Sequence, residues 1–282
     1  VTGNAKQKEI NISSGATLTA NASNVTAGTL KNEGTLVTYG NLNNLTSLTN
    51  TTNTGTVQIK SRETLNVTAD KNLGGTLDLH SSTLNMQEPT EGVTPVYSTL
   101  TVGTLKNTGN LLIDTNLKDD AKYADNIIYT TANDAIVKLT NIKVREGFTT
   151  HTTTAKDNWI TVLTGDETAQ LTLGDDGKVV SQFGLYEYTF TQGSEYGKLS
   201  VSELYTGTTL TDYITGTDKA KELTSYNFDG DESLTTPITT GSVKDFGKPY
   251  IVNMNGDALT GSGNNGITIS SGKTLTVNGG EP

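Results

Sequence analysis

The sequence predicts an all-β protein, a parallel β-helix (β-solenoid), and three observations carry this prediction. A short phrase with a central apolar residue recurs about every 20 residues, a spacing typical of one solenoid coil. Its apolar residues follow one another at steps of 18, 21, 20 and 23 residues and are Leu18, Leu36, Val57, Leu77 and Leu100. Apolar residues around each phrase alternate with Thr, Asn or Gln, as in strands with one buried face. Turn signals that contain glycine separate these strands.

Composition supports a narrow β-structure and excludes several classes of function. Only 33% of the 282 residues are hydrophobic, yet the charged fraction is 18% and the apolar residues are regularly ordered, which argues against disorder. A net charge of −10 offers no basic face for nucleic acid. No apolar run approaches the roughly 20 residues that span a bilayer, so we expect no membrane insertion of this segment. Cysteine is absent, so hydrogen-bonded ladders must replace disulfides.

Residues 1–116 form the regular part of the predicted solenoid. The expected strands are short and are 9–12, 17–19, 35–38, 57–59, 65–67, 77–79, 100–102 and 111–113. The glycines of the intervening turns are expected to supply a positive φ, and they are Gly15, Gly34, Gly55, Gly74, Gly75 and Gly109. The segment from Gly28 to Gly34 returns as Gly103 to Gly109, which puts Asn32 and Asn107 at the same place in the phrase. We expect both asparagines to be structural ladder residues at solenoid corners.

Residues 117–205 are richer in aromatic residues and contain longer strands, at 126–129, 135–139, 159–163 and 186–190. Wider coils and a cap over the end of the solenoid both explain this change, and a cap protects an otherwise open edge.

Residues 206–282 are irregular at first and then return to the solenoid repeat. Residues 267–279 match residues 10–22 at nine of thirteen positions, at an offset of 257. Either the phrase is generic for this coil type, or the parent protein is an array of long tandem units. Because the chain begins at Val1 without a signal peptide, we expect a processed piece of a larger secreted protein.

These repeats resemble the passenger region of bacterial autotransporters, the pertactin-like and AIDA-like surface adhesins. The phrase at residues 267–279 is typical of that family. The succession of residues 110–117, 123–129 and 137–144 is similar to the C-terminal passenger segment of the family, and the strands at 159–163 and 186–188 fit the next strands of that segment. The resemblance covers residues 10–205 and implies a right-handed parallel β-helix exported to the cell surface.

The sequence offers little for catalysis. Two histidines, His80 and His151, are too few for a multi-histidine metal site, and a triad based on histidine is not expected. Asp229, Asp231 and Glu232 are the best calcium candidates, although a solvated turn explains them better. Acidic residues at positions 114, 119, 120 and 125 are interpreted as a surface cluster. We therefore expect neither enzyme activity nor a cofactor.

The predicted function is an adhesin-like rigid stalk or display surface, secreted to the bacterial cell surface. Host or bacterial glycans or proteins are the expected partners, through an aromatic segment that contains Tyr186, Tyr188 and Tyr196. One alternative is a structural fibre or matrix subunit that self-associates from tandem units. A second is a β-helix enzyme that degrades polysaccharides, which requires two carboxyl groups facing one groove.

Overall fold

The computed structural model describes residues 10–24, 30–42, 53–89, 97–117, 123–146, 159–183, 186–205, 208–220, 223, 225–228, 231–254 and 256–279. The chain forms two compact units, which are described separately. The first consists of Val1–Ser181 and Thr189–Ser202, and the second of Gln182–Tyr188 and Glu203–Pro282. The finer division expected at residue 116 stays a prediction.

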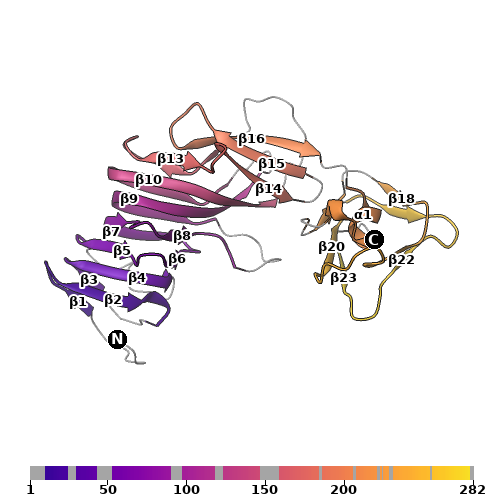
Figure 1. Ribbon diagram of the computed structural model, residues 1–282, viewed down its shortest axis with the longest axis horizontal. Helices are drawn as coiled ribbons and strands as arrows, with labels where there is room; N and C mark the ends of the chain where they lie inside the picture. The colour runs from indigo at the N-terminus through magenta and orange to yellow at the C-terminus, as the bar shows by residue number, and fades with distance from the viewer. Residues whose placement is uncertain are drawn as a thin grey trace. The chain divides into compact units, whose positions relative to one another are not determined.

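The first unit is a stack of parallel strands, which confirms the predicted parallel β-helix (Figure 1). Its principal sheet has ten strands in the order β12-β10-β9-β7-β5-β4-β6-β8, with β2 joined to β4 and β13 to β10. The strands of this unit are β1 (Ile10–Ile12), β2 (Thr17–Asn21), β3 (Leu30–Asn32), β4 (Thr35–Asn41), β5 (Thr56–Ile59), β6 (Thr64–Asn66), β7 (Lys71–Asp78), β8 (Thr83–Asn85), β9 (Thr99–Asn116), β10 (Asn126–Glu146), β11 (Trp159–Thr161), β12 (Leu163–Thr164), β13 (Gln170–Leu173), β14 (Lys178–Phe183), β15 (Tyr186–Gln192) and β16 (Lys198–Tyr205). The last three of these strands each have residues in the second unit as well.

The register of the stack confirms most of the repeat and corrects its last step. Leu18 pairs with Leu36, Leu36 with Val57, and Val57 with Leu77. The next residue in this row is Leu105, whereas Leu100 pairs with Lys71. A Thr-Leu phrase occurs both at Leu100 and at Leu105. The row of paired residues that contains Leu77 continues through the second of these phrases, at Leu105. The last step of the repeat is therefore 28 residues.

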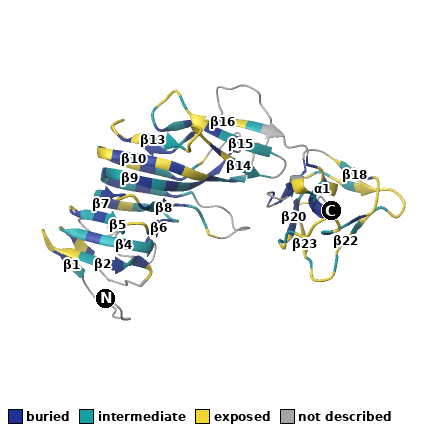
Figure 2. Cartoon of the chain, in the orientation of Figure 1, coloured by how far each residue is buried: buried dark blue, intermediate teal, exposed yellow. Residues whose placement is uncertain are grey.

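A second apolar row runs along another face of the coils. Leu65, Leu84, Leu111 and Leu139 pair in succession from β6 to β10. None of the four is more than 1% exposed. Figure 2 shows the resulting alternation of buried and more exposed residues along the strands. Each coil thus adds few apolar side chains but buries them almost completely, which explains the low hydrophobic fraction.

Close approach of the backbone, more than a positive φ, explains the glycines at the first corner of the coils. Of the six turn glycines expected to adopt a positive φ, only Gly15 and Gly74 do so, at 77° and 60°. A Cβ added at Gly55 would collide with the carbonyl oxygen of Gly34, and one at Gly75 with that of Gly55. One at Gly103 would lie 2.9 Å from the carbonyl oxygen of Gly75. The glycines are therefore stacked, one per coil, where neighbouring backbones leave no space for a side chain.

The aromatic-rich region combines wide coils with a separate sheet. The two strands expected at 126–129 and 135–139 are parts of one long strand, β10, which pairs with β9 along most of its length. Beyond it lies a four-stranded sheet in the order β11-β16-β15-β14, in which β11 and β16 are antiparallel. The choice between wider coils and a cap over the end of the solenoid stays a prediction.

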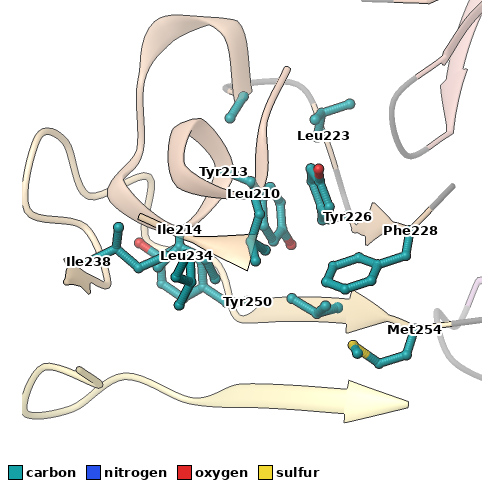
Figure 3. Close-up of a cluster of buried hydrophobic side chains, with 12 residues drawn as sticks. Leu210, Tyr213, Ile214, Leu223, Tyr226, Phe228, Leu234, Ile238, Tyr250 and Met254 are labelled. Atoms are coloured by element: carbon teal, nitrogen blue, oxygen red, sulfur yellow. The ribbon is translucent and has the colours of Figure 1, made fainter. Parts of the chain in front are cut away.

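The second unit is a smaller parallel stack of two coils. Its strands are β17 (Tyr226–Asn227), β18 (Glu232–Leu234), β19 (Ile238–Thr239), β20 (Tyr250–Asn253), β21 (Leu259–Gly261), β22 (Ile267–Thr268) and β23 (Leu275–Asn278). They pair in parallel as β17-β20-β23, β18-β21 and β19-β22, which gives three faces. A short helix, α1 (Leu210–Thr215), packs against the stack and contributes Leu210, Tyr213 and Ile214 to its buried core (Figure 3).

Candidate functional site

Asp78 is an acidic residue of a regular coil, and both oxygens of its carboxylate accept hydrogen bonds. Its Oδ2 accepts a hydrogen bond from Gln58 Nε2 at 3.0 Å, and its Oδ1 accepts one from Asn107 Nδ2 at 2.8 Å. The backbone N–H of His80 also donates to Oδ1, at 3.0 Å. These three donors hold a carboxylate that is only 5% exposed. The arrangement links coils and leaves this carboxylate poorly placed for acid–base chemistry.

The two predicted ladder asparagines lie at different corners. Asn32 is fully buried and donates from Nδ2 to Asn53 Oδ1 at 3.1 Å, and Asn53 donates in turn to the carbonyl of Leu73 at 2.5 Å. Asn107 has a φ of 62° and donates to Asp78. The shared phrase around the two residues therefore does not place them in one row. Asn53, which the phrase comparison missed, is the neighbour of Asn32 in the inner row.

Asp114 and Asp125 are buried, so the interpretation of this cluster as a surface feature is wrong for both. Each is 0% exposed. Asp125 accepts hydrogen bonds from the backbone N–H groups of Ser98 and Asp114, each at 2.6 Å. Asp114 accepts one from Arg145 Nη2 at 2.7 Å. Residues 119 and 120 lie outside the described residues.

Burial makes Asp125 an unusually weak acid. Removal of the carboxyl group from water is the largest effect and raises its pKa to about 8. The two backbone hydrogen bonds oppose this rise, whereas the negative charges of Asp114 and Glu88 add to it. The carboxyl group is therefore mostly protonated at neutral pH. Because its side chain is fully buried, it belongs to the interior of the coil stack.

The predicted calcium residues do not form a cation site in the part of the chain that the structure describes. Asp231 accepts a hydrogen bond from the backbone N–H of Ala258 at 2.8 Å, and Glu232 accepts one from the Tyr226 hydroxyl. Burial raises the pKa of Glu232, while the Tyr226 hydrogen bond acts against this rise. Asp229 lies outside the described residues, as does His151. Among described residues, no three His, Cys, Asp or Glu side chains gather as metal ligands would.

The three tyrosines expected to contact a ligand are packed to different degrees. Tyr188 is 1% exposed and has no surface to offer a ligand, so a packing role fits it better. Tyr186 packs against the buried core of the second unit. Tyr196 donates its hydroxyl to the carbonyl of Ala169 at 2.9 Å and bonds to the Tyr129 hydroxyl. Burial, reinforced by the Tyr129 hydrogen bond, raises the pKa of Tyr196.

Trp159 and Tyr123 are the aromatic residues most exposed in the described parts of the chain, at 42% and 57%. Trp159 begins β11, the edge strand of the four-stranded sheet, opposite Ser200 of β16. Lys198 Nζ lies 4.0 Å from the centroid of the indole ring and also pairs with Glu195. An exposed indole beside a cation and a carboxylate combines a flat apolar surface with hydrogen-bonding groups. Sequence reasoning placed Trp159 in a strand but gave no signal of its exposure.

A shallow hollow of about 360 Å³ lies where the chain turns between the first and second halves of β10. It is lined by Ala132, Asn133, Asp134, Ala135, Ile136, Thr168 and Gln170. Asp166 stands beside it and accepts hydrogen bonds from Thr168 Oγ1 at 2.6 Å and from the backbone N–H of Ala132 at 3.3 Å. The Thr168 hydroxyl lowers the pKa of Asp166. The lining is mostly polar, without a nucleophile–base pair.

The comparisons with known proteins gave one family match. The family model for Pertactin matches residues 75–200, which include β9, β10 and most of the aromatic-rich sheet. Neither the curated proteins nor the solved structures contain a match to the chain. Among the described helices, none has the length and apolar character required to cross a bilayer. The family match indicates a passenger segment of the secreted, surface-exposed kind. Residues 75–200, built of the parallel coils and the sheet beyond them, are thus a region similar to the passengers of autotransporters.

Proposed function

We propose that this chain is a non-enzymatic, adhesin-like protein of the bacterial surface, in which the β-helix serves as a rigid support for a ligand-binding face. The Pertactin match over residues 75–200 carries the proposal, because passengers of that family are generally non-enzymatic adhesins.

The coil stack has the construction that a rigid support requires. Backbone hydrogen bonds continue from coil to coil, and the buried bond from Asn32 to Asn53 and the half-buried bond from Gln58 to Asp78 add cross-links along the axis. Bending the stack would separate these groups on one side, and buried polar groups without partners cost about 1–3 kcal/mol each. A support of this kind holds a ligand-binding face away from the surface that anchors it.

The ligand contact that we propose is the indole of Trp159, and the ligand class is a glycan. The ring is exposed on an edge strand, where a sugar can lie against its apolar face. Lys198 and Glu195 beside it supply a donor and an acceptor for sugar hydroxyls. This choice replaces Tyr188, whose ring is buried, with an aromatic residue of the same region that reaches the surface.

The test begins with a glycan array probed with the purified chain. Trp159 is the single tryptophan, so its fluorescence reports directly on a sugar that stacks on the ring. Titration with an array-positive glycan is expected to shift or quench the emission, and Trp159→Ala is expected to weaken binding at least tenfold.

Tyr123→Ala is the matched control, because it removes another exposed aromatic ring, one stacked on Tyr97 with 6.1 Å between centroids. It is expected to leave glycan binding unchanged. Equal losses in the two variants, or array binding that Trp159→Ala does not reduce, would reject the indole as the contact. The appearance of new reducing ends in a bound polysaccharide would reject the non-enzymatic role.

A further inference from the structure

The four-stranded sheet beyond the coils has one face that packs inward and one that meets water. Successive residues of a strand alternate between the two faces of a sheet. Leu199 of β16, Phe190 of β15 and Val179 of β14 are buried and belong to the inner face. On β14 the Ser181 hydroxyl accepts a hydrogen bond from the backbone N–H of Val144 at 3.2 Å, so this inner face meets the end of β10. The residues between these positions lie on the opposite, outer face.

The outer face carries an apolar side chain at each edge and hydroxyl groups between the edges. Trp159 of β11 and Val180 of β14 are 42% and 43% exposed, and their strands are the two edges of the sheet. The hydroxyl side chains of the two middle strands are those of Ser200, Ser202, Thr189 and Thr191. The Ser202 hydroxyl donates to the Thr189 carbonyl at 3.4 Å, which brings the hydroxyl groups of the two strands together. These six residues are called the outer sheet face below.

The residues that the first unit contributes to the four strands leave no charge unpaired. Lys178 and Lys198 are the charged residues among them. Lys198 pairs with Glu195 and lies over the indole of Trp159, and Lys178 Nζ lies 3.4 Å from a carboxylate oxygen of Asp176. Strand positions that face water commonly carry charged side chains. Here the surface is instead apolar at its edges and polar but uncharged between them.

This combination matches an uncharged glycan better than a charged one. The C–H groups of a pyranose ring pack against an indole or a valine, and its hydroxyl groups exchange hydrogen bonds with serine and threonine. An acidic sugar would meet only lysines that already have carboxylate partners on this face. The net charge of −10 on the chain would also repel it.

The width of the sheet indicates how many sugars can bind. The strand order β11-β16-β15-β14 places Trp159 and Val180 three inter-strand steps apart, which is roughly 14 Å at about 4.8 Å a step. One pyranose unit of an extended chain is about as long as one such step, so a chain laid across the strands covers the sheet with about four sugars.

We propose that the outer sheet face binds an uncharged linear polysaccharide laid across its strands, from Trp159 at one edge to Val180 at the other. This inference rests on the proposed glycan-binding role and extends it from one aromatic contact to a face of defined length and charge. Trp159 holds the first sugar, the hydroxyl groups of the middle strands bond the next ones, and Val180 supports the last. Affinity is therefore expected to grow with chain length up to about four sugars and then to stay constant.

The first experiment measures the binding of short glycans of defined length. The probes are neutral oligomers of glucose, mannose and N-acetylglucosamine with one to six units, and oligogalacturonates of the same lengths as the charged series. Trp159 fluorescence and calorimetry report Kd. For at least one neutral series, Kd is expected to fall at least about tenfold from two to four units and to change by less than about twofold beyond four. Affinity that does not depend on length, or equal binding of oligogalacturonates, would overturn the proposal.

The second experiment tests the edge of the sheet that lies away from the indole. Val180→Asp is expected to weaken binding of the four-unit oligomer at least about fivefold and to leave the two-unit oligomer unchanged, whereas Trp159→Ala weakens both. Val243→Asp is the matched control, because Val243 is 68% exposed and belongs to the second unit. It is expected to change neither affinity. Circular dichroism verifies that the variants fold. Equal effects of Val180→Asp on the two oligomers, or an effect on neither, would contradict the extended face.

The outcomes distinguish this inference from the proposed function. A chain that binds one sugar through Trp159 as tightly as four keeps the glycan-binding role and loses the extended face. A chain that binds no glycan of the array loses both. Sedimentation velocity tests a second copy of the chain as the occupant of this face. Dimers of the natural chain that Val180→Asp dissociates would overturn the assignment to a polysaccharide.

Discussion

Replacement of Gly75 by alanine tests whether close backbone packing holds the coils together. The added Cβ would lie well under 3.0 Å from the carbonyl oxygen of Gly55, and 3.0 Å from that of Asn53. Both neighbours are backbone atoms, so the coils must separate locally. Two ladder bonds at this point would weaken, from Gly75 N–H to Asn53 at 2.7 Å and from Thr76 N–H to Gly55 at 2.9 Å.

The expected cost can be worked out from these contacts. Overpacking of a closely packed site costs about 1–3 kcal/mol, and each weakened bond adds about 0.5–1 kcal/mol. We therefore expect Gly75→Ala to lower the free energy of unfolding of the first unit by about 3 kcal/mol. With a urea dependence of about 2 kcal/mol/M, the unfolding midpoint would fall by about 1.5 M.

Urea unfolding followed by Trp159 fluorescence measures this change, because Trp159 belongs to the first unit. Far-ultraviolet circular dichroism follows the whole chain in parallel. The control is Gly266→Ala, whose added Cβ would meet no atom within 4 Å. It is expected to change stability by less than about 0.5 kcal/mol. A Gly75→Ala chain as stable as this control would refute the close-packing explanation of the glycine row.

Three further predictions concern buried polar groups and the helix cap. Because the raised pKa of Asp125 lets the folded chain keep a proton that the unfolded chain releases above about pH 4, stability is expected to fall as pH rises from about 5 to about 8. The free energy of unfolding falls by at most about 1.4 kcal/mol per pH unit from this group. Urea unfolding of Asp125→Asn at the same pH values should not show this fall, and equal pH dependence of stability in the wild type and the variant would contradict the prediction. Asn53→Ala removes the buried bond from Asn32 Nδ2, which keeps only the Thr56 carbonyl, and takes the side-chain donor from the Leu73 carbonyl, so a loss of about 2 kcal/mol is expected in the same urea assay. A loss below about 0.5 kcal/mol would show that water replaces the bonds. Thr209→Ala removes the N-cap of α1 and is expected to lower the free energy of unfolding of the second unit by about 1 kcal/mol. Urea unfolding followed by near-ultraviolet circular dichroism of the tyrosines measures this change, and an unchanged unfolding midpoint would argue against the cap.

Local pattern was enough to predict the coils but not every register. The alternation around Leu18, Leu36, Val57 and Leu77 is a property of each strand, so it can be read along the chain. The pairing of Leu105 in place of Leu100 depends on how the preceding connection folds, which the phrase itself does not encode. The same limit applies to Asn107, whose phrase matches that of Asn32 while its coil places it at another corner.

The candidate site was predicted less completely than the fold. The alternation of residues predicted that Trp159 lies in a strand, and the structure places it at the start of β11. Exposure, however, is decided by which strand ends a sheet: Trp159 lies on an edge, while Tyr188 lies inside. Charge patterns misled in a similar way at Asp114 and Asp125, because acidic residues near a turn are usually solvated.

The sequence by itself determined that this chain stacks parallel β-coils, since a period near 20 residues with alternating apolar side chains buries a core only by stacking. It also contained the likeness between the first and last coils. Only the tertiary structure decided which acids are enclosed and which aromatic ring reaches the surface. The physical reason is that burial and hydrogen-bond partners in a solenoid come from the neighbouring coils, about 20 to 30 residues away along the chain.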